Sequence, residues 1–146
     1  MIKVEIDLNA LKANLRYVKA KAGVPVLAVV KADAYGHGLV RCAQAAVDAG
    51  ADYLGTATLG EAITLREAGI KVPLLAWLLP PGEDFHRAVQ LDIELGLSSL
   101  AAFDEVNAIV GAKIHLEIES GMGRGGFFNE WPELLNRDLS KVVGIF

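Results

Sequence analysis

The stretch AVVKADAYGHG, residues 28–38, ends an apolar run on a lysine and then passes through a tyrosine and a histidine between two glycines. A lysine at the end of a buried strand can form a Schiff base with an aldehyde cofactor. Taken alone, Lys31 is more typical of a solvated strand end followed by a turn. A chemical role for Lys31 therefore needs support from its neighbours.

Pyridoxal phosphate is the aldehyde cofactor that proteins usually hold in this way. Glycines close behind the lysine let the backbone approach a bulky ring, and the Tyr35 hydroxyl can donate to a phosphate oxygen. His37 lies between glycines and is more typical of a loop or a helix start than of a proton carrier. The stretch thus indicates a cofactor site built on Lys31 and Tyr35.

A second stretch, HLEIESGMGRGG at residues 115–126, places two carboxylates on one face of an alternating strand, just before a glycine-rich turn around Arg124. The planar guanidinium suits bidentate binding of a carboxylate or an anionic ring oxygen, and a neighbouring acid can hold it in position. A surface salt bridge beside an ordinary turn would produce the same pattern. Arg124 is therefore a candidate anion-binding residue, with Glu117 or Glu119 as its partner.

Six apolar runs typical of buried strands begin near residues 26, 53, 73, 93, 113 and 142. Segments with helical spacing lie between several of them: residues 43–50, residues 58–69 with a capping box of Thr58 and Glu61, and residues 103–111. At the start of the chain, a short strand at residues 4–6 is expected to precede a helix that Asp7 caps and Gly23 ends, with one apolar face made of Leu8, Leu11, Leu15 and Val18.

Consecutive strand and helix units predict a parallel sheet, either doubly wound and open or part of a (β/α)₈ barrel. The segment KADAYGHG does not match the dinucleotide-binding pattern G-x-G-x-x-G, which favours the barrel. Five to six strands are fewer than eight, so we expect an incomplete TIM-type barrel whose chain is cut near Phe146. The carboxyl ends of its strands would carry Lys31, Tyr35, Thr56, Thr58, Glu117, Glu119 and Arg124.

Composition narrows the classes of function. The chain has 146 residues, of which 53% are hydrophobic, and a net charge of −4 without a basic block, so neither nucleic acid nor a membrane surface is an expected partner. Cys42 is the only cysteine, and we interpret it as a small buried residue of a helix, with no metal site proposed. The sequence has no secretory signal and no apolar run long enough to span a membrane, which favours the cytoplasm.

Together the two motifs resemble the alanine racemase family. AVVKADAYGHG is similar to the pyridoxal-phosphate attachment site of that family, and HLEIESGMGRGG is similar to its later H-L-K-x-D-T-G-M-G-R segment. VEIDLNALKANL near the start and VVGIF at the end also resemble the family, in the same order. The resemblance implies that residues 1–146 are the N-terminal portion of its cofactor-binding barrel.

The resemblance implies roles for four residues. Lys31 matches the lysine that holds the cofactor and exchanges the α-proton on one face of the substrate. Tyr35 matches a ligand of the cofactor phosphate, and Arg124 matches the arginine that reaches the phenolic oxygen and the substrate carboxylate. Glu117 falls where many members carry a carbamylated lysine, and it offers a permanent carboxylate to orient Arg124. If the register differs by two residues, Glu119 takes that role.

The family resemblance also implies parts beyond this sequence: further barrel strands, a β-rich C-terminal domain, and a homodimer in which the partner supplies the opposite proton carrier. The implied reaction is interconversion of L- and D-alanine for peptidoglycan, with residues 1–146 alone expected to be inactive. The alternatives are a remnant that binds pyridoxal phosphate without catalysis, a subunit that depends on a partner, and a racemase for another amino acid. KADAYGHG argues against a decarboxylase.

Overall fold

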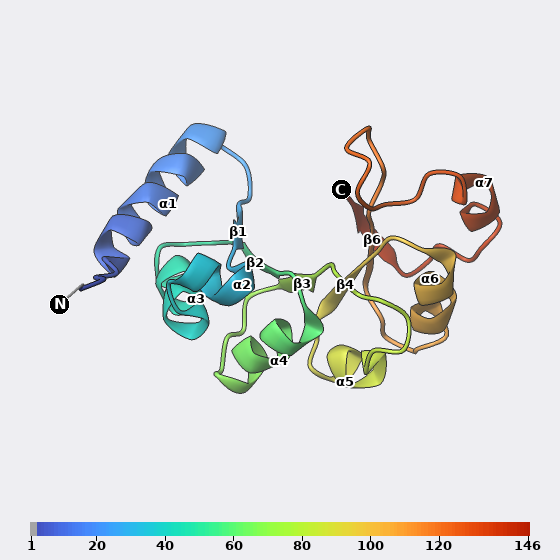
Figure 1. The fold of residues 1–146 in the computed structure, drawn as a ribbon, viewed down its shortest axis with the longest axis horizontal. Helices are drawn as coiled ribbons and strands as arrows, with labels where there is room; N and C mark the ends of the chain where they lie inside the picture. The colour runs from blue at the N-terminus through green and yellow to red at the C-terminus, as the bar shows by residue number, and fades with distance from the viewer. Residues whose placement is uncertain (1–2) are drawn as a thin grey trace.

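The computed structural model describes residues 3–146, which form one parallel sheet with helices along one side (Figure 1). The strands lie in chain order: β1 (Leu27–Val29), β2 (Tyr53–Thr56), β3 (Leu74–Ala76), β4 (Glu94–Leu97), β5 (Ile114–Leu116) and β6 (Val142–Ile145). All five neighbouring pairs are parallel, and the sheet is open at β1 and β6. This confirms the predicted six-stranded portion of a barrel.

One helix precedes the first strand and the others fall between strands. The helical spacing predicted four of them, and the helices at residues 31–36, 85–90 and 131–134 were not predicted. The helices are α1 (Leu8–Ala22), α2 (Lys31–Gly36), α3 (Leu39–Asp48), α4 (Leu59–Glu67), α5 (Phe85–Gln90), α6 (Leu100–Asn107) and α7 (Trp131–Leu134). Figure 1 shows α3, α4, α5 and α6 following one another along the outer side of the sheet. No helix within residues 3–146 has both the length and the apolar character needed to cross a membrane.

The termini of two helices form as predicted. The Asp7 side chain accepts the backbone N–H groups of Asn9 and Ala10 at the start of α1, and Gly23 ends this helix in a left-handed conformation. The capping box of Thr58 and Glu61 begins α4. The expected strand at residues 4–6 is wrong: residues 3–7 form no strand and Val4 is 80% exposed, because no neighbouring strand among the described residues supplies hydrogen bonds.

The two faces of the sheet differ in what they bury. Toward the helices, the strands present a continuous row of side chains that are at most 2% exposed: Leu54, Leu74, Ala76, Leu95, Leu97, Ile114 and Leu116. On the opposite face, the large side chain of Trp77 lies between glycines of the neighbouring strands. A Cβ on Gly55 would lie 2.6 Å from the Trp77 ring, and one on Gly96 would lie 2.8 Å from Trp77 Cβ. Glycines at these two positions therefore make room for the indole of Trp77.

Arg66 of α4 joins two loops at the amino ends of the strands. Its guanidinium donates to four backbone carbonyls: Ile70 and Val72 before β3, and Leu91 and Asp92 before β4. Burial lowers the pKa of Arg66, but a guanidinium stays charged in proteins. One side chain thus satisfies acceptors in two separate loops.

Candidate functional site

Lys31 lies where the sequence predicts, directly after β1 at the carboxyl edge of the sheet. The residue before it, Val30, is only 4% exposed and fixes the end of the strand in the core. Lys31 itself is half-buried, and its Nζ lies 5.8 Å from the centroid of the Trp77 ring, a cation–π distance. The lysine is therefore held against the open face of the sheet rather than extended into solvent.

The chain leaves Lys31 in a left-handed turn. Ala32, Asp33, Ala34 and Tyr35 have φ angles of 53°, 54°, 52° and 56°. Side chains with a Cβ adopt this conformation at a cost, so four in succession are unusual. The sequence points to a turn through Gly36 and Gly38, but the left-handed turn already begins at Ala32. Tyr35, the last residue of this left-handed turn, lies on the surface and is 60% exposed.

Hydrogen bonds within the segment join the turn to α3. The Asp33 carboxylate accepts the Leu39 N–H at 2.6 Å, and the Asp33 carbonyl accepts the Gly38 N–H at 2.9 Å. His37 Nδ1 lies 2.9 Å from the carbonyl oxygen of Ala34. These contacts fit the predicted role of His37 at a helix start.

Cys42 follows in α3 and is 1% exposed, as predicted for a buried helical residue, and burial raises the pKa of its thiol.

The glycine-rich loop after β5 is organised by Glu119. Its carboxylate accepts the backbone N–H groups of Gly121 and, at 3.1 Å, of Arg124. Hydrogen bonds from backbone N–H groups, with that of Gly123 first, hold the pKa of Glu119 below its ordinary value. Glu119 therefore binds the main chain of the loop and is already engaged there.

Glu117 occupies the other position considered for the partner of Arg124. A Cβ on Gly125 would lie 3.3 Å from Glu117 Oε1, so this carboxylate lies against the loop directly beside Arg124. Both residues line a cavity of about 150 Å³ that Phe146 also borders. No ion pair joins Glu117 to the Arg124 guanidinium among residues 3–146. The two residues thus line one cavity without forming an ion pair in residues 3–146.

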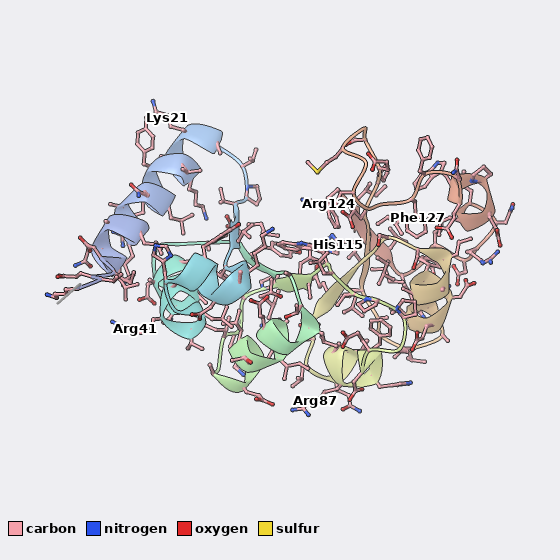
Figure 2. All side chains as sticks on the ribbon, in the orientation of Figure 1. Lys21, Arg41, Arg87, His115, Arg124 and Phe127 are labelled. Carbon is pink, nitrogen blue, oxygen red and sulfur yellow. The ribbon has the colours of Figure 1, made fainter. Side chains whose placement is uncertain are left out.

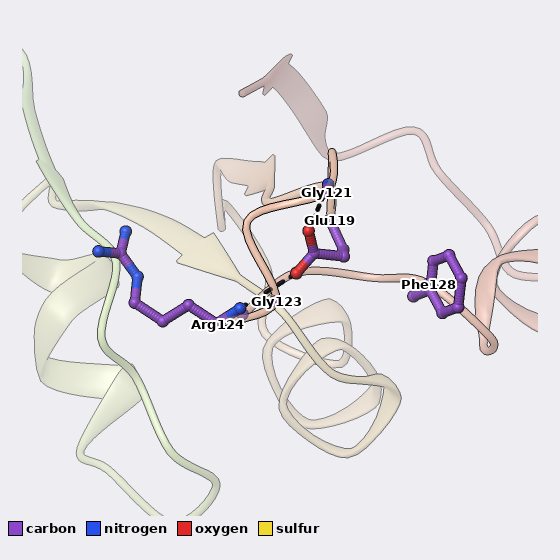
Figure 3. Close-up of a pocket in the computed structure, with 7 residues that line it drawn as sticks. Glu119, Gly121, Gly123, Arg124 and Phe128 are labelled. Carbon is purple, nitrogen blue, oxygen red and sulfur yellow. Dashed lines mark hydrogen bonds between the residues drawn. The ribbon is translucent and has the colours of Figure 1, made fainter.

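Arg124 also borders a wider pocket of about 500 Å³ with Phe128 and the loop glycines. Figure 3 shows its side chain extending away from the loop, on the side opposite Phe128. In Figure 2, Arg87 lies on the side of the sheet that the helices cover, whereas His115 and Arg124 lie toward the other side. The Arg124 side chain therefore lies toward the open face of the sheet.

The structure groups these residues by position rather than by contact. Lys31, Glu117 and Arg124 all follow the carboxyl ends of parallel strands, so they share one edge of the sheet. Two predicted polar residues have other tasks: buried Thr56 donates to the Thr58 carbonyl at 3.2 Å, and Thr58 caps α4. No cluster of three metal-ligating side chains occurs among residues 3–146.

Sequence reasoning missed two contributors to the open face of the sheet. Trp77 reads as the end of an apolar run, and the glycines that flank it in β2 and β4 were the available signal. His115 reads as a polar strand residue, but its Nε2 lies 2.6 Å from Glu94 Oε2, with the two side chains 15% and 7% exposed. This buried pair stands on the same face as Trp77, because His115 pairs in register with Gly96, where a Cβ would meet Trp77.

Comparison with known proteins adds independent evidence. The family model described as "Alanine racemase, N-terminal domain" matches residues 6–146. An alanine racemase from Salinispora tropica is 47% identical over 140 residues, which cover 92% of this chain and 38% of that protein. One from Mycolicibacterium smegmatis is 44% identical over 138 residues, covering 90% and 36%. The chain thus spans less than half the length of these relatives.

Solved structures agree with the sequence comparison. The alanine racemase of Streptomyces lavendulae has 42% identity and a TM-score of 0.90, covering 96% of this chain and 40% of that one. The Corynebacterium glutamicum enzyme has 35% identity and a TM-score of 0.91, covering 97% and 44%. The described sheet therefore superposes on a part of each larger protein.

Proposed function

Because the chain belongs to the alanine racemase N-terminal domain family, we propose that residues 1–146 form the cofactor-binding part of an alanine racemase, which interconverts L- and D-alanine. The observation that carries this proposal is Lys31, at the carboxyl end of β1 with its Nζ over the Trp77 ring on the open face of the sheet. A lysine placed there can bind an aldehyde and exchange a proton beside it.

The residues present suit pyridoxal phosphate. Lys31 would hold the cofactor, the Trp77 indole would lie against its ring, and the exposed Tyr35 hydroxyl would reach its phosphate. Arg124, whose side chain extends away from the glycine-rich loop, would bind the phenolic oxygen and the substrate carboxylate, with Glu117 beside the loop to orient the guanidinium. When bound, pyridoxal phosphate makes the α-proton of an amino acid acidic.

Lys31 would remove or return that proton on one face of the substrate. Racemisation needs a proton carrier on each face, and the family resemblance assigns the second to a partner subunit in a homodimer of the longer protein. We place residues 1–146 as the N-terminal portion of the barrel, followed in the longer protein by further strands and a β-rich domain. The D-alanine would supply peptidoglycan synthesis in the cytoplasm.

The test is to treat the protein with pyridoxal phosphate and borohydride and to locate the pyridoxyl group by peptide mass spectrometry. We expect one modified residue, Lys31, and loss of that label in Lys31→Ala but not in the matched surface variant Lys71→Ala. Labels spread over exposed lysines would contradict the proposal. Incubation with L-alanine in D₂O extends the test, since cofactor capture without α-deuterium exchange favours a binding remnant over a racemase.

A further inference from the structure

The carboxylate of Glu61 joins two successive units of the sheet at the candidate site. Its side chain belongs to α4, where Oε2 accepts the backbone N–H groups of Ala57 and Thr58, each at 3.2 Å. Its other oxygen, Oε1, accepts the Asp33 N–H at 3.2 Å, and the Ala32 N–H is near enough to help lower the pKa of the carboxylate. Glu61 thus binds the capping segment of α4 and the turn after Lys31 at once.

The turn needs such an external contact. Left-handed φ angles at four residues with side chains persist only where the surroundings impose them. The bonds from Asp33 and His37 join the turn to its own backbone and to α3, which follows it in the same strand and helix unit. Glu61, in contrast, comes from the neighbouring unit and is fixed by its own helix. Glu61 therefore connects the turn to the neighbouring unit of the sheet.

The charge of Glu61 suits this contact. Burial is the largest influence on its pKa and raises it, but the N–H groups of Thr58, Asp33, Ala32 and Ala57 together lower the pKa below the ordinary value. Glu61 is therefore an anion that accepts several N–H groups, and hydrogen bonds to a charged acceptor are stronger than those to a neutral one.

We propose that Glu61 is a positioning residue for Lys31, acting through the left-handed turn that begins at the next residue. The carboxylate binds the N–H of Asp33 and attracts that of Ala32, and these two residues set the direction in which the chain leaves Lys31. The ammonium of Lys31 is thereby kept over Trp77 instead of moving with a loose strand end. This inference rests on the proposed function, in which Lys31 receives the cofactor.

The experiment compares Glu61→Gln with Thr58→Ala. The glutamine keeps the size of the side chain but turns one acceptor oxygen into a donor, whereas Thr58→Ala removes the other half of the capping box and leaves the carboxylate in place. Amide hydrogen exchange of the protein without cofactor reports on the turn, and borohydride trapping of pyridoxal phosphate reports on Lys31. We expect Glu61→Gln to speed exchange at Ala32 and Asp33 about tenfold, and to lower trapping at Lys31.

Thr58→Ala is expected to speed exchange at the start of α4 only, with trapping at Lys31 unchanged. Equal effects of the two variants on Ala32 and Asp33 would overturn the proposal and leave Glu61 a helix cap. Glu61→Asp provides the same test if the glutamine variant does not fold. The shorter carboxylate can still cap α4 but withdraws from Asp33, so unchanged exchange at the turn would likewise overturn the proposal.

The two proposals fail in different ways. If the wild-type protein captures no pyridoxal phosphate at Lys31, the proposed function fails, and the positioning role for a cofactor lysine fails with it even where Glu61→Gln loosens the turn. If the wild-type protein captures the cofactor and Glu61→Gln changes neither exchange nor trapping, the proposed function stands and the positioning role alone is overturned.

Discussion

The same chemical change is expected to have opposite effects on stability at Ala32 and Ala13. Both residues are exposed, but Ala32 has φ 53° in the left-handed turn, whereas Ala13 lies in the middle of the right-handed helix α1. A left-handed conformation costs an alanine about 1–2 kcal/mol. Glycine avoids that cost but loses about 0.5–1 kcal/mol more conformational entropy on folding.

Ala32→Gly is therefore expected to raise the free energy of unfolding by about 0.5–1 kcal/mol, the difference between these terms. Ala13→Gly should lower it by about 1 kcal/mol, since a helix interior gives glycine nothing in return. Urea unfolding followed by the fluorescence of Trp77 and Trp131 measures both, with the slope against urea expected to stay constant. A loss of stability in Ala32→Gly as large as that in Ala13→Gly would refute the left-handed turn.

Two further predictions concern the open face and the loop. Gly96→Ala would place a Cβ 2.8 Å from Trp77 Cβ, so we expect it to lower the free energy of unfolding by about 1–3 kcal/mol. Gly60→Ala is the control and should cause no loss, because a Cβ there would have nothing within 4 Å. Equal losses in the two variants would contradict the close approach of Gly96 to Trp77. Because the folded-state pKa of Glu119 lies below its ordinary 4.5, its hold on the loop is present above pH 4.5 and is lost as pH falls through the lowered pKa. The Gly121 amide shift in NMR should report that midpoint, and a midpoint above 4.5, or one that persists in Glu119→Gln, would contradict the role of this carboxylate.

Elements with local signals were predictable from the sequence. The capping box of Thr58 and Glu61 and the glycine that ends α1 depend on neighbours in the chain, so they formed as expected. The strand at residues 4–6 failed because alternation predicts a face but not a hydrogen-bonded neighbour. The six strands succeeded because each has a parallel partner in the next unit.

The tertiary parts of the site were not readable in the same way. The capping box predicts where Glu61 binds in α4, yet its second set of N–H groups is 28 residues away in sequence at Asp33. Alanine disfavours the left-handed region, so no propensity indicates a turn at Ala32. The candidate site residues Lys31, Arg124 and Glu117 were instead proposed from motifs, which give positions along the chain but no distances.

The four hydrogen bonds that Arg66 donates to main-chain carbonyls determine which positions of this fold can be substituted. The four acceptors are main-chain carbonyls, which every amino acid possesses, so residues 70, 72, 91 and 92 can exchange side chains without losing the bonds. The requirement is concentrated on a single guanidinium, because lysine has no planar fork to serve two loops. The loops before β3 and β4 should therefore tolerate substitutions, whereas a substitution of Arg66 should not be tolerated.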